Sequence, residues 1–171
     1  MISLRPLTLD DAEPLADLII RNREFMTPWE PTREEDYFTP SWQRGAVSRL
    51  LDAAAAGTTL PYVILERDEI AGRITLNNVV RGPLLSASVG YWVDQGHGGR
   101  GIATDALAAL IPIAFGEHGL HRLEAGTLVH NHRSQAVLRR NGFVQYGLAP
   151  RYLRIAGEWQ DHLLFQLLDE A

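Results

Sequence analysis

The fold is decided at residues 88–104, which read Ser-Val-Gly-Tyr-Trp-Val-Asp-Gln-Gly-His-Gly-Gly-Arg-Gly-Ile-Ala-Thr. Strand-like sequence ends at Val93, and apolar residues recur at helical spacing from Ile102. Between these two points lie four glycines: Gly96, Gly98, Gly99 and Gly101. Glycines let consecutive backbone N–H groups turn toward one point, and the first turn of a helix adds unpaired N–H groups at the positive end of its dipole. The stretch therefore predicts an anion site, most often for phosphate.

The glycine loop lacks the residues of two common nucleotide sites. A Walker loop needs Lys and Ser or Thr after its last glycine, but Gly101 is followed by Ile102 and Ala103. The dinucleotide pattern needs a further glycine where Thr104 stands, and the loop lies in mid-chain, after several strands. The remaining prediction is a pyrophosphate held mostly by backbone, as coenzyme A would require. The alternative is a flexible loop that binds nothing.

Composition indicates an ordinary globular protein. The 171 residues are 46% hydrophobic and 22% charged, and we expect one domain spanning residues 1–171. The absence of cysteine excludes a thiol nucleophile and disulfides. No apolar run approaches the ~20 residues of a membrane span, so we expect a cytoplasmic protein. The net charge of −5 argues against nucleic-acid binding and is compatible with a basic partner.

Hydrophobic periodicity predicts the order β-α-α-β-β-β-α-β-α-β-β. Strands are expected at 2–7, 60–66, 70–79, 84–93 and 122–129, from Phe143, and in a last hairpin across residues 156–158. Helices are expected at about 8–22, 41–56, 102–118 and 132–140, and Pro112 should kink or shorten the third. This order predicts one mixed sheet covered by helices, an α/β or α+β fold.

Residues 23–41 show no period and are predicted to form a loop. The loop is rich in aromatic residues and proline, and it includes Pro28-Trp29-Glu30-Pro31. Apolar residues on an irregular segment often mark a binding surface. The alternative is that Trp29 only folds the loop back on the core.

Three segments carry a resemblance to a known family: Val89-Gly90-Tyr91-Trp92-Val93, Gly99-Arg100-Gly101-Ile102-Ala103-Thr104, and Asn131-His132-Arg133-Ser134 ahead of Asn141-Gly142-Phe143. They resemble the GCN5-related N-acetyltransferases (GNAT), which use acetyl-CoA, and the resemblance covers nearly the whole chain. Residues 22–31, 78–82 and 157–162 resemble the RimJ/RimL branch, which acetylates the α-amino group of ribosomal proteins. The Pro-Trp-Glu-Pro stretch is similar to the RimJ side, whose substrate begins with alanine.

The resemblance implies how the coenzyme would bind. The fold would be a mixed, mostly antiparallel sheet with helices on both faces, in which strand 89–93 splays from the parallel strand 122–129. Backbone near Trp92 and Val93 would pair with pantetheine, and Asn131 and Ser134 would also meet the coenzyme. The pyrophosphate would rest on the amides of Gly98, Gly99, Arg100, Gly101, Ile102, Ala103 and Thr104. Gly98 departs from the family, which often has Gln or Arg there, so backbone donors would hold the phosphates at that place without a side chain.

The resemblance also implies direct attack of the acceptor amine on the thioester. Ser134 matches the position of the proton donor to the leaving thiolate, although helix capping is the alternative role for both Ser134 and Asn131. A backbone N–H near Val93 would polarise the thioester carbonyl. Glu30 and Asp161 are assigned to holding the acceptor amine. The candidates for the base, left unranked, are Glu30, Glu124, His130 and Asp161.

The leading hypothesis is therefore an acetyl-CoA-dependent acetyltransferase acting on a protein N-terminus. The expected acceptor is the basic N-terminus of a ribosomal protein, with no metal, membrane or direct nucleic-acid partner. Two alternatives stay open: a GNAT enzyme for a small amine such as an aminoglycoside or polyamine, and a non-catalytic acetyl-CoA sensor. The sequence leaves monomer and homodimer equally open.

Overall fold

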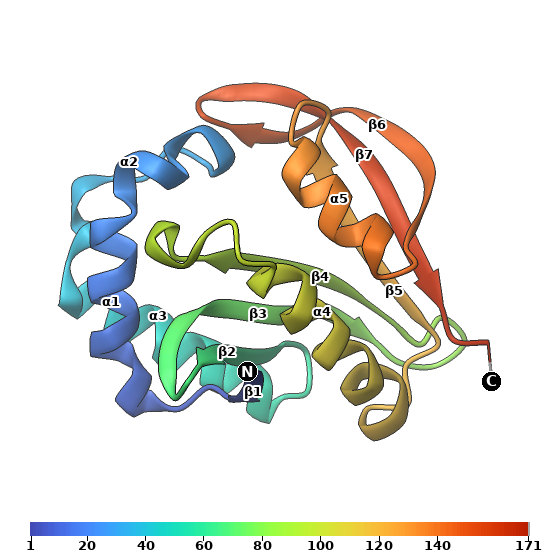
Figure 1. Cartoon of the computed structure of the whole chain (residues 1–171), viewed down its shortest axis with the longest axis horizontal. Coiled ribbons are helices and arrows are strands. Elements are labelled where there is room, and N and C mark those ends of the chain that lie inside the picture. The colour runs from blue at the N-terminus through green and yellow to red at the C-terminus, as the bar shows by residue number, and fades with distance from the viewer. Residues whose placement is uncertain (171) are drawn as a thin grey trace.

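The computed structural model describes residues 1–170 as one seven-stranded sheet flanked by helices (Figure 1). The strand order is β1-β2-β3-β4-β5-β7-β6, and every neighbouring pair except β4–β5 is antiparallel. The mixed, mostly antiparallel sheet predicted from the sequence is confirmed. Its strands are β1 (Ile2–Pro6), β2 (Leu60–Glu66), β3 (Glu69–Val80), β4 (Ser86–Val93), β5 (Arg122–Leu128), β6 (Val144–Ile155) and β7 (Glu158–Leu168).

Helices cover both faces of the sheet, as predicted. Successive strand residues point to opposite faces, so Val63 and Ile64 of β2 join different cores. Val63 packs against Leu15 and Val47 beneath two helices, whereas Ile64 packs with Leu107 on the other face. The helices are α1 (Ala12–Arg21), α2 (Arg23–Met26), α3 (Pro40–Ala55), α4 (Ile102–Pro112) and α5 (His132–Arg140). No helix within residues 1–170 is long and apolar enough to cross a membrane.

The predicted loop at 23–41 is wrong in part, because it contains short helical turns. These are α2 and the 3₁₀ turns Thr27–Trp29 and Glu35–Phe38. Turns of three or four residues are too short to show a 3.6-residue period, so pattern analysis misses them. The predicted interruption at Pro112 is confirmed, since α4 ends there and a π-helical turn, Ile113–Glu117, follows.

The predicted splay of the parallel strands is also confirmed. Parallel pairing covers only three residue pairs, from Ser86↔Arg122 to Ser88↔Glu124. Beyond that point β4 continues to Val93 and β5 to Leu128 without pairing to each other. The two strands diverge toward the side where α2 and the β6–β7 hairpin lie (Figure 1). The ends of β4 and β5 beyond this pairing therefore face one another with unpaired backbone edges.

Candidate active site

A cavity of about 350 Å³ occupies the splay between β4 and β5. Gly90, Tyr91 and Trp92 line it from β4, and Gly126 and Thr127 line it from β5. The start of α5 closes one side, where two residues predicted from the sequence, Asn131 and Ser134, also lie. The structure thus brings Trp92, Asn131 and Ser134 together. Val93 is not among the lining residues, and its side chain packs against the core under α4.

The glycine loop leads from β4 into α4 as predicted. Gly99 and Gly101 have φ values of 77° and 78°, a left-handed conformation that favours glycine, and Gly101 is the N-cap of α4. Ile102 is buried and anchors the helix start, whereas Gly98, Gly99, Arg100 and Gly101 are exposed. Within residues 1–170 the amides of Gly99, Arg100 and Gly101 donate to no protein acceptor. The loop therefore offers free donors at a helix N-terminus.

Arg133 adds a cation beside this loop, which the sequence analysis did not assign. A Cβ placed on Gly98 would lie 4.0 Å from a guanidinium nitrogen of Arg133. Arg133 belongs to the first turn of α5, so its side chain reaches across from the far side of the splay. A positive side chain thus stands near Gly98.

A buried carboxylate, Asp94, fixes the loop to the C-terminal end of α1. It accepts a hydrogen bond from the Asn22 amide at 2.6 Å and one from His97 Nδ1 at 2.7 Å, and it pairs with Arg21 at 2.9 Å. The Asn22 side-chain oxygen in turn accepts the Gln95 N–H at 2.7 Å. Burial raises the pKa of Asp94, but hydrogen bonds from Asn22, His97 and Arg21 outweigh it and hold the pKa below the ordinary value. This network was not predictable from the sequence, because its two halves, residues 21–22 and residues 94–97, lie more than 70 positions apart.

Asp94→Asn should lower the free energy of unfolding at pH 7 by about 1–3 kcal/mol, because it removes the charge from the hydrogen bonds that Asp94 accepts. The Arg21 side chain is largely exposed, so its ion pair with Asp94 contributes little of this loss. Since the folded pKa is depressed, this stability is present above the unfolded pKa of about 3.9 and is lost as pH falls through the folded pKa. Urea unfolding of both proteins should show a constant difference from pH 7 to pH 5 that shrinks below about pH 4. Asp17→Asn, an exposed acid on α1, is the control. An equal loss in that variant would contradict the assignment.

Ser134 contacts Tyr91 across the cavity. The two hydroxyl oxygens are 2.9 Å apart, and the Tyr91 hydroxyl also lies 3.3 Å from the Ser134 carbonyl oxygen. Burial raises the pKa of Tyr91 to about 12, so the phenol is neutral at physiological pH. Capping of α5 is performed by Asn131, whose side-chain oxygen accepts the Ser134 N–H at 3.1 Å. The Ser134 hydroxyl is therefore available for another role.

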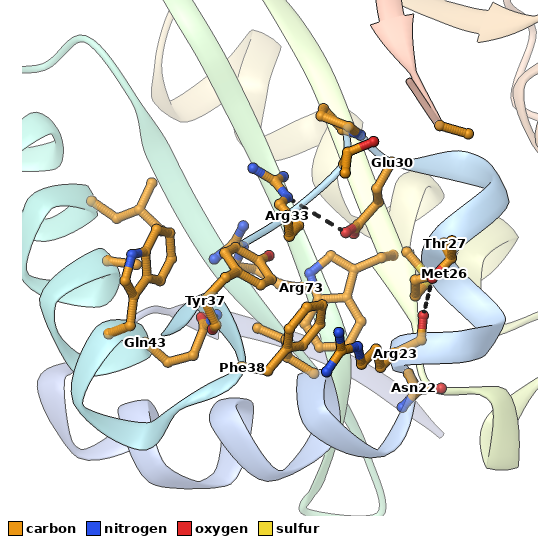
Figure 2. A pocket seen from close by; sticks show the side chains of 18 of the residues that line it. Asn22, Arg23, Met26, Thr27, Glu30, Arg33, Tyr37, Phe38, Gln43 and Arg73 are labelled. Carbon is orange, nitrogen blue, oxygen red and sulfur yellow. Dashed lines mark hydrogen bonds and ion pairs between the residues drawn. The ribbon is translucent and has the colours of Figure 1, made fainter. Parts of the chain in front are cut away.

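A second cavity, of about 570 Å³, lies between the 23–41 segment, α1, α3 and the strand pair β3–β4 (Figure 2). The two cavities share four lining residues: Met26, Glu30, Arg73 and Trp92. Trp29 lines the first cavity and packs on His130 with ring centroids 5.6 Å apart. The 23–41 segment therefore forms walls of both cavities.

Glu30 is the acid at the junction of the two cavities. Its nearest cation is Arg33, at 3.9 Å, a loose contact that Figure 2 marks. Burial raises the pKa of Glu30, and the nearby charges of Arg33 and Arg73 oppose that rise without cancelling it. A carboxylate with a raised pKa is a stronger base at neutral pH than an exposed one.

The other base candidates lie elsewhere. Asp161 is exposed on β7, where it accepts the Arg151 N–H at 2.9 Å, and it lines neither cavity. Glu124 is paired with Arg122 at 2.7 Å near the closed end of the splay. His130 is exposed and stacks on Trp29. Only Glu30 among the four candidates lines the cavities, and within residues 1–170 no group of three His, Cys, Asp or Glu is placed to hold a metal ion.

Comparison with known proteins identifies the family. Residues 2–144 match the acetyltransferase (GNAT) domain, and the chain belongs to this family. It is 36% identical over 159 residues to the ribosomal protein uS5-alanine N-acetyltransferase of Escherichia coli K12, covering 92% of this chain and 82% of that protein. It is 34% identical over 170 residues to the probable N-acetyltransferase YjcK of Bacillus subtilis 168, covering 98% and 94%. Among solved structures, Mycobacterium smegmatis RimJ in complex with CoA-disulfide has a TM-score of 0.95 and 37% identity, covering 99% of this chain and 82% of that one.

Proposed function

We propose that the protein transfers acetyl from acetyl-CoA to the α-amino group of a ribosomal protein whose N-terminal residue is alanine, in the cytoplasm. The observation that carries this proposal is the junction of the two cavities at Glu30 and Trp92, with Ser134 in the lining of the smaller cavity. One cavity thus serves each substrate, and they meet beside a carboxylate. The relatives named for uS5-alanine acetylation and for RimJ support the choice of acceptor.

The residues of the splay fit coenzyme A. The unpaired amides of the glycine loop and the guanidinium of Arg133 would hold the pyrophosphate. The unpaired edge of β4 near Trp92 and Val93 would pair with the pantetheine arm as a strand would. The buried Thr127 hydroxyl in the same cavity has no hydrogen-bond partner within residues 1–170, so a polar ligand atom would satisfy it. Acetyl-CoA, when bound, supplies an acetyl thioester.

The chain's own groups would then move two protons. Glu30 would take the proton of the acceptor ammonium, directly or through one water, because its raised pKa suits a base for an amine with a pKa of about 8. Ser134 would donate a proton to the departing sulfur, with the neutral Tyr91 phenol holding its hydroxyl in place. We infer that Asp161 shapes the β6–β7 pair and does not touch the acceptor, because it lines neither cavity.

The acceptor class is tested by following thiol release from acetyl-CoA with a panel of acceptors. The panel holds peptides that differ only in their first residue, together with spermidine and an aminoglycoside. We expect the highest kcat/KM with the alanine peptide. Turnover confined to the small amines would replace the protein acceptor by a small-molecule one, and tight acetyl-CoA binding without turnover of any acceptor would favour a sensor.

Gly101→Val should weaken coenzyme binding tenfold or more, a change of about 1.4 kcal/mol, measured by calorimetry. Valine at a φ of 78° strains the backbone and places a side chain where backbone must approach the pyrophosphate. Gly57→Val is the matched control, because Gly57 has a φ of 72°, equally open surroundings and a position outside both cavities. Unchanged coenzyme affinity in a folded Gly101→Val protein would place the coenzyme elsewhere.

A further inference from the structure

Arg73 is a half-buried cation for which residues 1–170 supply no ion-pair partner. It lies on β3 opposite Trp92 of β4 and lines both cavities at their junction. Within residues 1–170 its guanidinium makes no hydrogen bond and has no carboxylate within 4.0 Å, and no dashed line reaches it in Figure 2. Arginine carries five N–H donors, which buried sites normally satisfy. The free donors of Arg73 instead open into cavity space.

An unpaired charge that is partly removed from water costs free energy. Burial lowers the pKa of Arg73, and the approach of Arg33 adds to that effect, while Tyr37 and Glu30 only partly compensate. Removing one partner of a buried ion pair commonly destabilises a protein, because the remaining charge loses its compensation. Arg73 is half-buried and therefore carries part of that cost without any mutation. Such a charge is explained if a ligand supplies the missing partner.

The surroundings of Arg73 favour an anion. The larger cavity is lined by one acid, Glu30, and by four arginines: Arg23, Arg33, Arg49 and Arg73. Arg23 pairs with Glu35, and Arg33 lies 3.9 Å from Glu30. Within residues 1–170, Arg49 and Arg73 have no carboxylate within 4.0 Å. Arg33 and Arg49 lie over the rings of Tyr37 and Trp42 at 4.5 and 5.2 Å. In a chain with a net charge of −5, this cavity is a local region of positive charge.

We propose that Arg73 binds a carboxylate of the acceptor, so that the enzyme prefers acceptors with a carboxylate close to the amine that is acetylated. This inference rests on the proposed function and adds a second determinant to it. The planar guanidinium can hold a carboxylate through two parallel hydrogen bonds, which fixes orientation as well as charge. The amine would then lie toward Glu30 and Trp92, the other residues at the cavity junction.

The experiment compares peptides that begin with alanine and carry Asp or Asn at the second, third or fourth position. Asp and Asn have nearly the same shape, so the comparison isolates the charge. In the unmodified enzyme we expect kcat/KM to favour Asp at one of these positions by about tenfold to a hundredfold, as for a charge-assisted hydrogen bond in an enclosed site. The proposal would be overturned by two results together. These are equal kcat/KM for the Asp and Asn peptides at all three positions, and equal kcat/KM for Ala-Ala and its amide, Ala-Ala-NH₂.

Arg73→Gln should bring the ratio of kcat/KM for the Asp peptide to that for the Asn peptide to within about threefold of one. The ratio is the readout because loss of the Arg73 charge also acts on Glu30 and so affects both peptides alike. Arg67→Gln removes the same charge from the exposed β2–β3 turn and should leave the preference intact. Survival of the Asp preference in Arg73→Gln would overturn the proposal. Thermal unfolding separates a structural role: we expect Arg73→Gln to be as stable as the parent or more stable, because an unpaired charge is removed. A clear loss of stability together with equal losses on the Asp and Asn peptides would make Arg73 structural.

The carboxylate has two possible sources, which a further arm distinguishes. Ala-Ala and its amide, Ala-Ala-NH₂, differ only in the terminal carboxylate. If the enzyme prefers Ala-Ala and Arg73→Gln removes that preference, the carboxylate bound by Arg73 is the C-terminus of a short acceptor. If the enzyme prefers the Asp peptides and Arg73→Gln removes that preference, the carboxylate is a side chain. Turnover of neutral peptides without any Arg73-dependent preference would overturn this inference alone, whereas turnover of spermidine or the aminoglycoside only would overturn the peptide function itself.

Discussion

Glu30→Gln should lower kcat/KM for an alanine peptide by roughly 10²–10⁴-fold, the loss expected for one general base. Glutamine keeps the shape and the cavity lining but cannot accept the proton of the acceptor ammonium. The pH profile should also change. In a plot of kcat/KM against pH, the ascending limb due to Glu30 should have its midpoint above the ordinary glutamate pKa of about 4.3, because the pKa of Glu30 is raised. This limb should disappear in Glu30→Gln. The limb due to the amine itself, near pH 8, should remain.

Two further variants make the Glu30 assignment specific. Arg33→Gln removes a cation that lowers the pKa of Glu30, so the limb assigned to Glu30 should move to higher pH. Asp161→Asn removes an acid outside both cavities and keeps an oxygen to accept the Arg151 N–H, so its kcat/KM should be unchanged. An unchanged kcat/KM and an unaltered pH profile in Glu30→Gln would mean that water, and not Glu30, takes the proton of the acceptor ammonium.

Ser134→Ala should lower kcat by roughly 10²–10⁴-fold while acetyl-CoA affinity stays nearly constant. A proton donor to the departing thiolate acts mainly in the transition state, so its loss affects turnover more than binding. The α5 dipole also stabilises a thiolate at this helix start, which favours the lower end of the range. The measurement is single-turnover acetyl transfer with saturating coenzyme, in which product release cannot mask the chemical step.

The alternative role of Ser134, helix capping, makes a different prediction. Asn131 caps α5, so Ser134→Ala should leave the free energy of unfolding nearly unchanged, whereas Asn131→Ala should lower it by about 0.5–2 kcal/mol. Ser134→Thr should recover part of the turnover, because it restores a hydroxyl next to Tyr91. Unchanged single-turnover rates in Ser134→Ala would mean that water, and not Ser134, donates the proton to the departing thiolate.

The long periodic elements and the glycine loop were predictable because their signals are local. The switch from strand to helix across residues 93–102 appears in the sequence as a change of period, and Gly99 and Gly101 adopt the positive φ values that such a loop requires. The splay of β4 and β5 came only from the family resemblance. No periodicity within a strand reports where its neighbour stops pairing with it. The helical turns at 23–41 escaped because they are shorter than one period.

The site was predictable only where its residues lie in short motifs. Trp92, Asn131 and Ser134 reach one cavity as expected, whereas Asp161 matched a branch segment and yet lies on the exposed face of β7. Asp94 and Arg73 were missed for a common reason. The role of Asp94 and the proposed role of Arg73 depend on residues distant in sequence: donors from Arg21 and Asn22 reach Asp94, and no acceptor within residues 1–170 reaches the Arg73 guanidinium.

The most direct test of the central claim is to locate the acetyl group on the product. The protein is incubated with acetyl-CoA and an alanine peptide that also contains an internal lysine, and fragment-ion mass spectrometry locates the modification. We expect acetylation of the α-amino group of alanine, with the lysine unmodified, and loss of this product in Glu30→Gln and Ser134→Ala. Acetyl on the lysine side chain, or transfer to spermidine or an aminoglycoside but not to the peptide, would contradict it.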